Sequence, residues 1–339
     1  MRLAALAVLL VGAGTATSVS AYEFPPQLRE DMQIFADRVV AKHRLDEDRV
    51  RETLLKIQFQ QSVIQAVNAP ATSRPWKDFR VGLLSRQRID GGVRYWAANG
   101  ATLQRARETF GVPEELIVSI IGIETLYGRN MGSYRVLDAV ATLAFEVPAR
   151  STFFQGELEE FLLLCRDLDL DPLALRGSYA GAMGAPQFIP SSYRRYARDF
   201  DDDGRVDLWA SPADAIGSVA NYLKEFGWRW TGEVALRANV TDAQRADELV
   251  RLGVRPVHSA AQIEEKGVTP HRPLRDGENA ALMLFQGDGG PEYWLGLDNF
   301  YVITRYNRSQ NYAMAVWQLS QEILLARRKA SAAGSGLGK

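Results

Sequence analysis

This chain of 339 residues has few cysteines and histidines and a net charge near zero. Each of these features argues against a kind of chemistry. The one cysteine, Cys165, cannot form a disulfide within the chain, and its apolar neighbours predict a small buried side chain. The three histidines are scattered, and neither a His-Glu-x-x-His zinc pair nor a phosphate-binding P-loop is present. A formal net charge of -1 gives no sign of the basic patch that nucleic-acid binders carry. We therefore expect no nucleic-acid partner.

Long apolar runs are also missing, and the one near the N-terminus is too short to cross a membrane. Met1-Arg2 gives a positive start, residues 3–14 are apolar, and Val19-Ser20-Ala21 has the small-x-small pattern of a signal-peptidase site. This pattern predicts a cleaved signal peptide over 1–21, with an uncleaved anchor as the alternative. No cysteine stands near the cleavage site to be lipidated. We expect a periplasmic protein that starts near Tyr22 and has no transmembrane anchor.

Most of the remaining chain has helical periodicity. Apolar residues recur at helical spacing through 25–67, and the same pattern predicts helices over 93–110, 116–125, 153–166, 213–226 and 312–327. The stretch 116–125 is apolar on nearly all sides and is therefore expected to be buried. The length of the chain favours two or three packed units.

The character of the chain changes between residues 231 and 297. Residues 233–237 and 281–285 are predicted strands, Gly287-Asp288-Gly289-Gly290 is a predicted hairpin turn, and 259–267 is a predicted short helix. The predicted fold class is therefore mainly α, of the α+β kind, with a small β-containing insertion. The tail, 331–339, is predicted to be disordered.

Glu124 is the residue with the clearest potential for catalysis. It stands at the end of the apolar stretch 116–125, close to Gly122. Burial there would raise the pKa of its carboxyl group and keep the group protonated near neutral pH, as a general acid requires. The alternative is a glutamate at a helix end that turns to solvent, and spacing alone does not separate the two.

A second segment, 176–190, combines small residues with hydroxyl and amide side chains that could hydrogen-bond a sugar. Alone it is a weak signal, because glycine also serves any tight turn. Together, Ile123-Glu124-Thr125 and Gly181-Ala182-Met183-Gly184-x-x-Gln187-Phe188-Ile189-Pro190 resemble the lytic transglycosylases, specifically the lytic murein transglycosylase B family with its membrane-bound and soluble members. The resemblance covers most of the chain after the signal, including segments at 128–132, 216–222 and 303–307.

The resemblance implies the domain organisation. It implies a goose-lysozyme-like catalytic core over 111–230 and 298–330, an N-terminal helical domain over 22–110 with parts of 148–175, and a small β-containing insertion over 231–297. The core is expected to include an EF-hand-like loop at 199–214.

The resemblance also implies the site residues. Glu124 takes the place of the only catalytic carboxylate in that family, and the matching substrate-binding positions are Phe79, Arg150, Ser178, Gln187, Tyr222, Tyr306, Asn307 and Tyr312. Two positions depart from the family. Phe79 replaces an expected tyrosine, which removes a hydroxyl contact, and Ala149 replaces an arginine beside Arg150, which weakens the expected contact with an anionic peptide stem.

One carboxylate suffices for the implied reaction on peptidoglycan strands. Glu124 would protonate the glycosidic oxygen after N-acetylmuramic acid and then take the proton of that sugar's C6 hydroxyl, giving a 1,6-anhydro end without using water. Two alternatives remain. A lysozyme-like hydrolase would need a second carboxylate, for which Asp138 and Glu146 are nearest in sequence. A non-catalytic peptidoglycan-binding protein would need none.

The acidic run at 199–207 predicts a metal site. Asp199, Asp201 and Asp203 occupy positions 1, 3 and 5 of an EF-hand-type loop, and Gly204 supplies the sharp turn at position 6. Arg205 offers its backbone carbonyl at position 7. Oxygen ligands of this kind suit Ca²⁺, which would relieve the repulsion among the carboxylates.

The standard closing glutamate is missing, because position 12 is Ala210. The resemblance implies a longer loop that is closed by a later aspartate, Asp214. We therefore expect one structural Ca²⁺ and no organic cofactor, with a solvated acidic turn as the alternative. The expected ligands are Asp199, Asp201, Asp203, the Arg205 carbonyl and Asp214.

Overall fold

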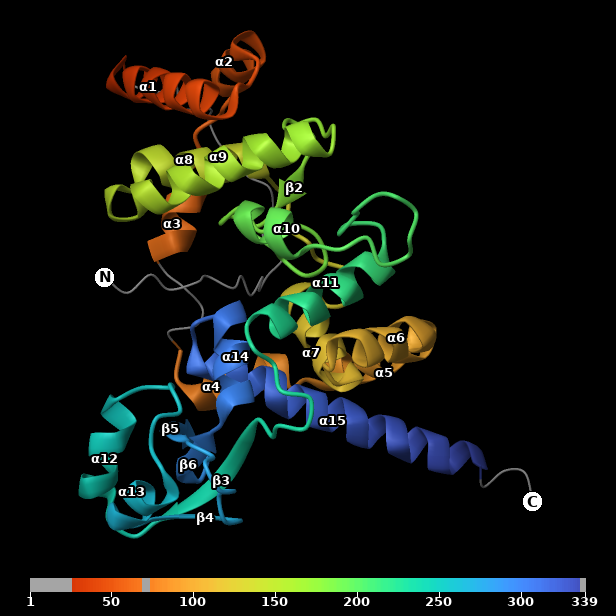
Figure 1. Ribbon diagram of the computed structural model, residues 1–339, viewed down its shortest axis with the longest axis vertical. Coiled ribbons are helices and arrows are strands. Elements are labelled where there is room, and N and C mark those ends of the chain that lie inside the picture. The colour runs from red at the N-terminus through yellow and green to blue at the C-terminus, as the bar shows by residue number, and fades with distance from the viewer. Residues whose placement is uncertain (1–25, 69–73, 336–339) are drawn as a thin grey trace. The chain divides into compact units, whose positions relative to one another are not determined.

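The computed structural model describes residues 26–68 and 74–335, which form two compact units (Figure 1). Within the described residues, the first unit comprises 74–127 and 219–335, and the second comprises 26–68 and 128–218. The predicted signal peptide, 1–21, lies outside the described residues. None of the helices in the described parts of the chain combines the length and the apolar character needed to cross a membrane.

Helix α7 (Glu114–Thr125) is central to the first unit. It packs against α5 (Arg86–Ala98), α6 (Gly100–Phe110) and the long α15 (Gln310–Ser335). The other helices of this unit are α4 (Trp76–Leu83), α12 (Ala243–Arg251), α13 (Ala260–Glu265), α14 (Asp298–Tyr306) and the C-terminal part of α11 (Pro212–Glu225).

The β-containing insertion of the first unit is an antiparallel sheet in the order β4-β3-β6-β5. Its strands are β3 (Ala235–Val240), β4 (Val268–Pro270), β5 (Ala281–Gly287) and β6 (Gly290–Gly296). The predicted hairpin is confirmed, with Gly287 paired to Gly290 at the turn. The insertion has its own core, in which α12 contributes Ala246 and Leu249. Helix α12 was not predicted, although the side chain of Asp242 caps its first turn.

The second unit is built on the helix pair α8 (Val136–Glu146) and α9 (Ser151–Asp167). Its further elements are α1 (Pro26–His43), α2 (Glu47–Leu55), α3 (Gln61–Asn68), β1 (Tyr134–Arg135), the 3-10 helix η2 (Pro148–Arg150), β2 (Arg176–Gly177), α10 (Pro190–Tyr196) and the start of α11. Cys165 is buried in α9, as predicted. The segment between β2 and α10 is irregular.

The helices on both sides of residue 110 belong to one compact unit. The boundary expected at residue 110 does not separate the units, because α5 and α6 pack against α7. The helix expected over 93–110 is two helices, which meet at Asn99 and Gly100. The tail expected to be disordered is helical as far as Ser335, since its alanines favour helix; residues 336–339 lie outside the described residues.

Candidate active site

Helix α7 carries Glu124 into the interior of the first unit. All residues from Leu116 to Thr125 are buried, as their apolar character predicted. The helix ends directly after them because Leu126 and Tyr127 adopt positive φ angles of 51° and 64°. The amide of Leu126 donates to the carbonyl of Gly122 and closes the last turn.

The side chain of Tyr127 holds this helix end, a role that the sequence analysis missed. A Cβ atom at Gly91, Gly92 or Gly122 would lie 2.6, 2.8 or 2.5 Å from it, so these glycines leave room for the tyrosine. Its hydroxyl donates to the carbonyl of Arg88 at 2.6 Å, and the Arg88 Nε donates to the carbonyl of Gly122. The available signal was the Gly91-Gly92 pair, since glycine inside a helix costs stability and implies a packing reason.

The Glu124 side chain is enclosed, with 5% of its surface exposed. Its Oε1 atom accepts a hydrogen bond of 2.5 Å from the hydroxyl of Tyr312 on α15. Burial raises the pKa of Glu124 to about 8, and the hydrogen bond from Tyr312 opposes part of that rise. The carboxyl group is therefore protonated at neutral pH, and the expectation of a glutamate turned to solvent is excluded.

Three tyrosines extend from Glu124 as one aromatic array. The rings of Tyr312 and Tyr306 are nearly parallel, with centroids 6.4 Å apart, and Tyr306 contacts Tyr222 at 4.9 Å. The Tyr222 hydroxyl donates to the carbonyl of Arg305. Burial raises the pKa of Tyr306 and Tyr312, and the nearby Glu124 carboxylate raises both further. Both hydroxyls therefore stay neutral beside the acid.

Asn307 and Phe79 complete the predicted residues of the first unit. Asn307 is buried and accepts a hydrogen bond from the amide of Ser309, while its Nδ2 has no partner within the described residues. Phe79 is 5% exposed, and its ring packs against Trp76 in the same helix, α4. Phe79 therefore packs within the first unit, and the stacking of its ring on a sugar stays a prediction.

The irregular loop of the second unit contains Ser178 and Gln187. The Ser178 side chain is fully buried, and its hydroxyl oxygen accepts hydrogen bonds from the amides of Ala180 and Ala182. These bonds define the loop turn and leave the hydroxyl hydrogen to be donated. Ser178 therefore shapes the loop in addition to any contact with a substrate.

Gln187 adopts an unusual backbone conformation with a φ of 52°. Its Nε2 donates to the carbonyls of Met131 and Gly184, which fixes the side chain, and its Oε1 is buried without a partner in the described chain. A fixed, unpaired acceptor of this kind costs stability unless another molecule donates to it. Strain and an unpaired polar atom together are typical of a binding site.

Arg150 ends the 3-10 helix η2 and is half-buried. Its guanidinium forms no hydrogen bond or ion pair with the residues that the structure describes. Burial raises the pKa of Tyr179 to about 12, and the charge of Arg150 opposes that rise. Arg150 is thus a cation that remains available to an anionic ligand.

The two carboxylates considered for a hydrolase lie in the second unit. Asp138 is buried, and its oxygens accept hydrogen bonds from the amide of Gln58 and the guanidinium of Arg135. Fully paired in this way, it is a poor base for activating water. Glu146 has one buried, unpaired oxygen, and burial raises its pKa.

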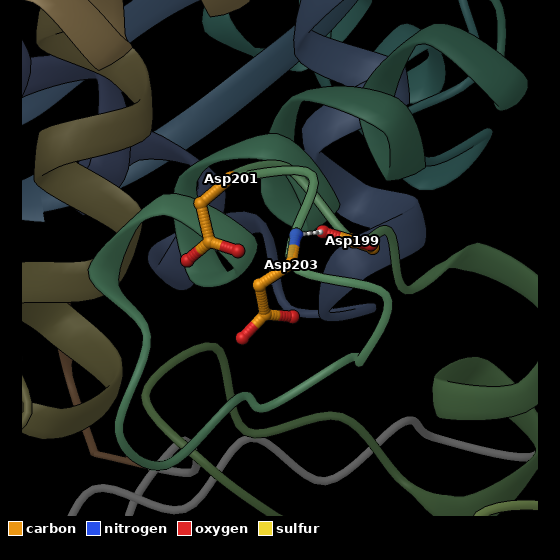
Figure 2. Close-up of side chains that lie close together, drawn as sticks. All are labelled: Asp199, Asp201 and Asp203. Carbon is orange, nitrogen blue, oxygen red and sulfur yellow. Dashed lines mark hydrogen bonds between the residues drawn. The ribbon is translucent and has the colours of Figure 1, made fainter.

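The acidic loop brings three of its predicted metal ligands together, as Figure 2 shows. One carboxylate oxygen from each of Asp199, Asp201 and Asp203 lies within 4.8 Å of the others. The amides of Asp203 and Gly204 donate to Asp199, which curls the loop, and Gly204 has a φ of 87° at the predicted sharp turn. Spacing in the sequence thus predicted this group correctly.

Asp214 is not a member of that group of carboxylates. It is 1% exposed, and its two oxygens accept hydrogen bonds of 2.7 Å from the amides of Phe200 and Asp207. Burial raises the pKa of Asp214, with the charges of Asp201 and Asp199 adding to the rise. Asp214 therefore ties the two sides of the loop together through the backbone, and the set of five ligands stays a prediction.

Comparisons with known proteins all find transglycosylases. The family model described as the transglycosylase SLT domain matches residues 27–321. The membrane-bound lytic murein transglycosylase B of Escherichia coli (strain K12) is 46% identical over 305 residues, which cover 87% of this chain and 83% of that protein.

Two solved structures are similar over most of the chain. The lytic transglycosylase Slt35 of Escherichia coli in complex with calcium superposes with a TM-score of 0.79 and 44% identity, covering 88% of this chain and 93% of that one. SltB3 from Pseudomonas aeruginosa in complex with NAG-NAM-pentapeptide gives a TM-score of 0.76 and 31% identity, and the match covers 87% of this chain and 79% of that one.

Proposed function

The chain belongs to the transglycosylase SLT family, and on this premise we propose that Glu124 is the single acid and base with which it cleaves peptidoglycan. It is a lytic murein transglycosylase with the lysozyme-like fold of that family. One observation carries the proposal. Among the described residues of the first unit, Glu124 is the one buried carboxylate, and its hydrogen-bond partner is a neutral hydroxyl.

The proposed reaction begins with the protonated carboxyl group. Glu124 gives its proton to the glycosidic oxygen, the bond from that oxygen to C1 of N-acetylmuramic acid breaks, and the neighbouring N-acetyl group stabilises the positive charge at C1. The carboxylate then takes the proton from the C6 hydroxyl, whose oxygen bonds to C1. Because Tyr312 donates to Oε1, the other carboxylate oxygen remains to exchange the proton.

Two unpaired polar atoms support contacts with the sugar. The Oε1 of Gln187 can accept a hydrogen bond and the Nδ2 of Asn307 can donate one, and both are buried without a partner in the described residues. Sugar hydroxyl and N-acetyl groups can supply a donor to the first atom and an acceptor to the second, each atom being considered within its own unit. We assign Gln187, Asn307, Tyr222 and Tyr306 to sugar binding, and Arg150 to the anionic peptide stem.

The product separates this proposal from its alternatives. Purified sacculi digested with the protein should release muropeptides that end in 1,6-anhydro-N-acetylmuramic acid, because the C6 hydroxyl replaces water as the nucleophile. Mass spectrometry detects these products as lighter by one water than those of a lysozyme. Free reducing ends would assign the protein to the hydrolases, and intact sacculi would identify a binding protein without activity.

We also propose that the acidic loop binds one Ca²⁺ through Asp199, Asp201, Asp203 and the carbonyl of Arg205, with Asp214 fixing the loop. Three exposed or half-buried carboxylates within 4.8 Å repel each other, and a hard cation with oxygen ligands relieves this repulsion. The similar Slt35 structure was solved with calcium. The role is structural, since Asp214 at the start of α11 ties the two sides of the loop together by accepting from the amides of Phe200 and Asp207.

Calcium should raise the melting temperature by about 3–5 °C at ten times its Kd, because it binds the folded loop. Differential scanning calorimetry with and without calcium measures the rise. Asp203→Ala should abolish it, whereas Asp202→Ala, whose carboxylate is outside the group, should retain it. If the two variants respond alike, or if millimolar calcium does not bind, the loop is only an acidic turn.

We propose further that residues 1–21 direct export and that the mature protein acts in the periplasm. The support is the pattern of positive start, apolar run and small-x-small site, together with a family whose substrate is the cell wall. N-terminal sequencing of the protein recovered from the periplasmic fraction should find Tyr22 first. Recovery of Met1 from a membrane fraction would contradict the proposal.

A further inference from the structure

A pocket lies in the first unit, at the junction between the β-containing insertion and the start of α14. Its volume is about 410 Å³. Its lining residues come from the segment between α12 and α13, from the residue two before β5, and from the first turns of α14: Arg255, Pro256, Val257, Asn279, Asp298 and Tyr301. None of them belongs to the site around Glu124.

The pocket has an excess of positive charge. Its one carboxylate, Asp298, pairs with Arg229 at 2.8 Å, and the guanidinium of Arg305 lies over the ring of Tyr301 at 4.1 Å. Arg255 is exposed and forms no hydrogen bond or ion pair with any described residue. The one carboxylate of the lining is thus already paired, and Arg255 is a lining cation whose charge no described residue pairs. This arrangement favours an anionic ligand.

The remaining walls suit a peptide. Val257 is 50% exposed and Pro256 lies beside it, so this side of the pocket offers an apolar surface to an alkyl side chain. Asn279 is exposed and can both donate to and accept from a peptide bond. A planar guanidinium such as that of Arg255 pairs with a carboxylate through two hydrogen bonds.

Helix α14 connects this pocket to the active site. Asp298 is its first residue and Tyr306, in the aromatic array beside Glu124, is its last. Eight helical steps span about 12 Å. Four extended peptide residues span about 13 Å. A peptide attached to a sugar beside Tyr306 can therefore reach the pocket.

We propose that this pocket binds a carboxylate of the murein peptide stem, with Arg255 as its partner and Asn279 hydrogen-bonding the peptide. The inference rests on the proposed function, because the stem is brought to the pocket by the glycan strand. It adds a determinant of substrate preference in the insertion, separate from Arg150.

The test compares two fragments that the enzyme cannot cleave further: the 1,6-anhydro disaccharide with its tetrapeptide stem, and the same disaccharide without the peptide. Isothermal titration of the full-length protein should show that Arg255→Ala binds the stem-bearing fragment about two- to fivefold more weakly, which is the range for an accessible ion pair. Binding of the stem-free fragment should not change. Arg255→Lys should retain part of the preference.

Arg251→Ala is the matched control. The side chain of Arg251 is 77% exposed, pairs with Asp247 on its own helix, and does not line the pocket. The Arg251→Ala variant should bind both fragments with the affinities of the unchanged protein. Equal affinities of the unchanged protein and Arg255→Ala for the stem-bearing fragment would overturn the inference alone. Failure of the unchanged protein to bind either fragment would overturn the proposed function, and the inference with it.

Discussion

Glu124→Gln should lower the turnover of murein by about 10²–10⁴-fold, the usual contribution of a general acid and base. Glutamine keeps the shape of the side chain and can still accept the hydrogen bond from Tyr312, so the first unit should remain folded. What it loses is the proton that Glu124 donates and takes back. Initial rates on purified sacculi, with circular dichroism of both proteins, measure the two effects.

The pH profile gives the same prediction a second readout. Because burial raises the pKa of Glu124 to about 8, the acid is protonated below that pH, and activity should fall as the pH rises through it. The residual activity of Glu124→Gln should lack this alkaline limb. Glu115→Gln is the matched control, since Glu115 lies on the same helix and burial raises its pKa too. Turnover of Glu124→Gln equal to that of this control would remove Glu124 from the mechanism.

Gly132→Ala should lower the free energy of unfolding of the second unit by about 3 kcal/mol or more. Gly132 has a φ of 94°, and a Cβ atom there would lie 2.1 Å from the carbonyl oxygen of Gly177, which is backbone and cannot turn away. The substitution should separate β1 from β2 and displace the loop with Ser178 and Gln187. The midpoint of urea unfolding and the initial rate on sacculi should both fall.

Gly132→Ala loses stability for two reasons, the left-handed backbone and the contact with Gly177. Gly128→Ala separates them. Gly128 has a φ of 82°, but no atom lies within 4 Å of the position its Cβ would take. The free energy of unfolding of this variant should therefore fall only by the cost of placing alanine in the left-handed backbone conformation, about 1 kcal/mol. If both variants lost the same stability, the contact with Gly177 would not matter, and the pairing of β1 with β2 would tolerate a methyl group.

Several features could be predicted from the sequence because they depend on residues that are neighbours along the chain. The apolar residues from 116 to 125 leave no side of that helix suited to water, so the burial of the helix could be predicted, whereas the direction of the Glu124 side chain at its end could not. The hairpin at 287–290 followed from its glycines. The alternation of Asp199, Asp201 and Asp203 was enough to predict that their carboxylates meet, since a tight turn places such positions on one side.

Features made by segments far apart in sequence were decided by the tertiary structure. Tyr312 reaches Glu124 across 188 residues, and only the packing of α15 against α7 brings the hydroxyl to the carboxyl group, where its hydrogen bond opposes part of the rise in pKa that burial causes. Packing also buries Phe79 against Trp76 and assigns α5 and α6 to the unit of α7.

Asp214 and Arg255 illustrate why the sequence alone did not settle the ligand sets. Asp214 has the right side chain and nearly the right spacing for a metal ligand, but the fold directs both of its oxygens to backbone amides. In the sequence, nothing distinguishes Arg255 from other surface arginines. The fold places it in one pocket with the first turns of α14, where the carboxylate of Asp298 is already paired with Arg229. Residue type and spacing determine which chemistry is available, and packing determines which partner each group meets, because contact depends on distance in space.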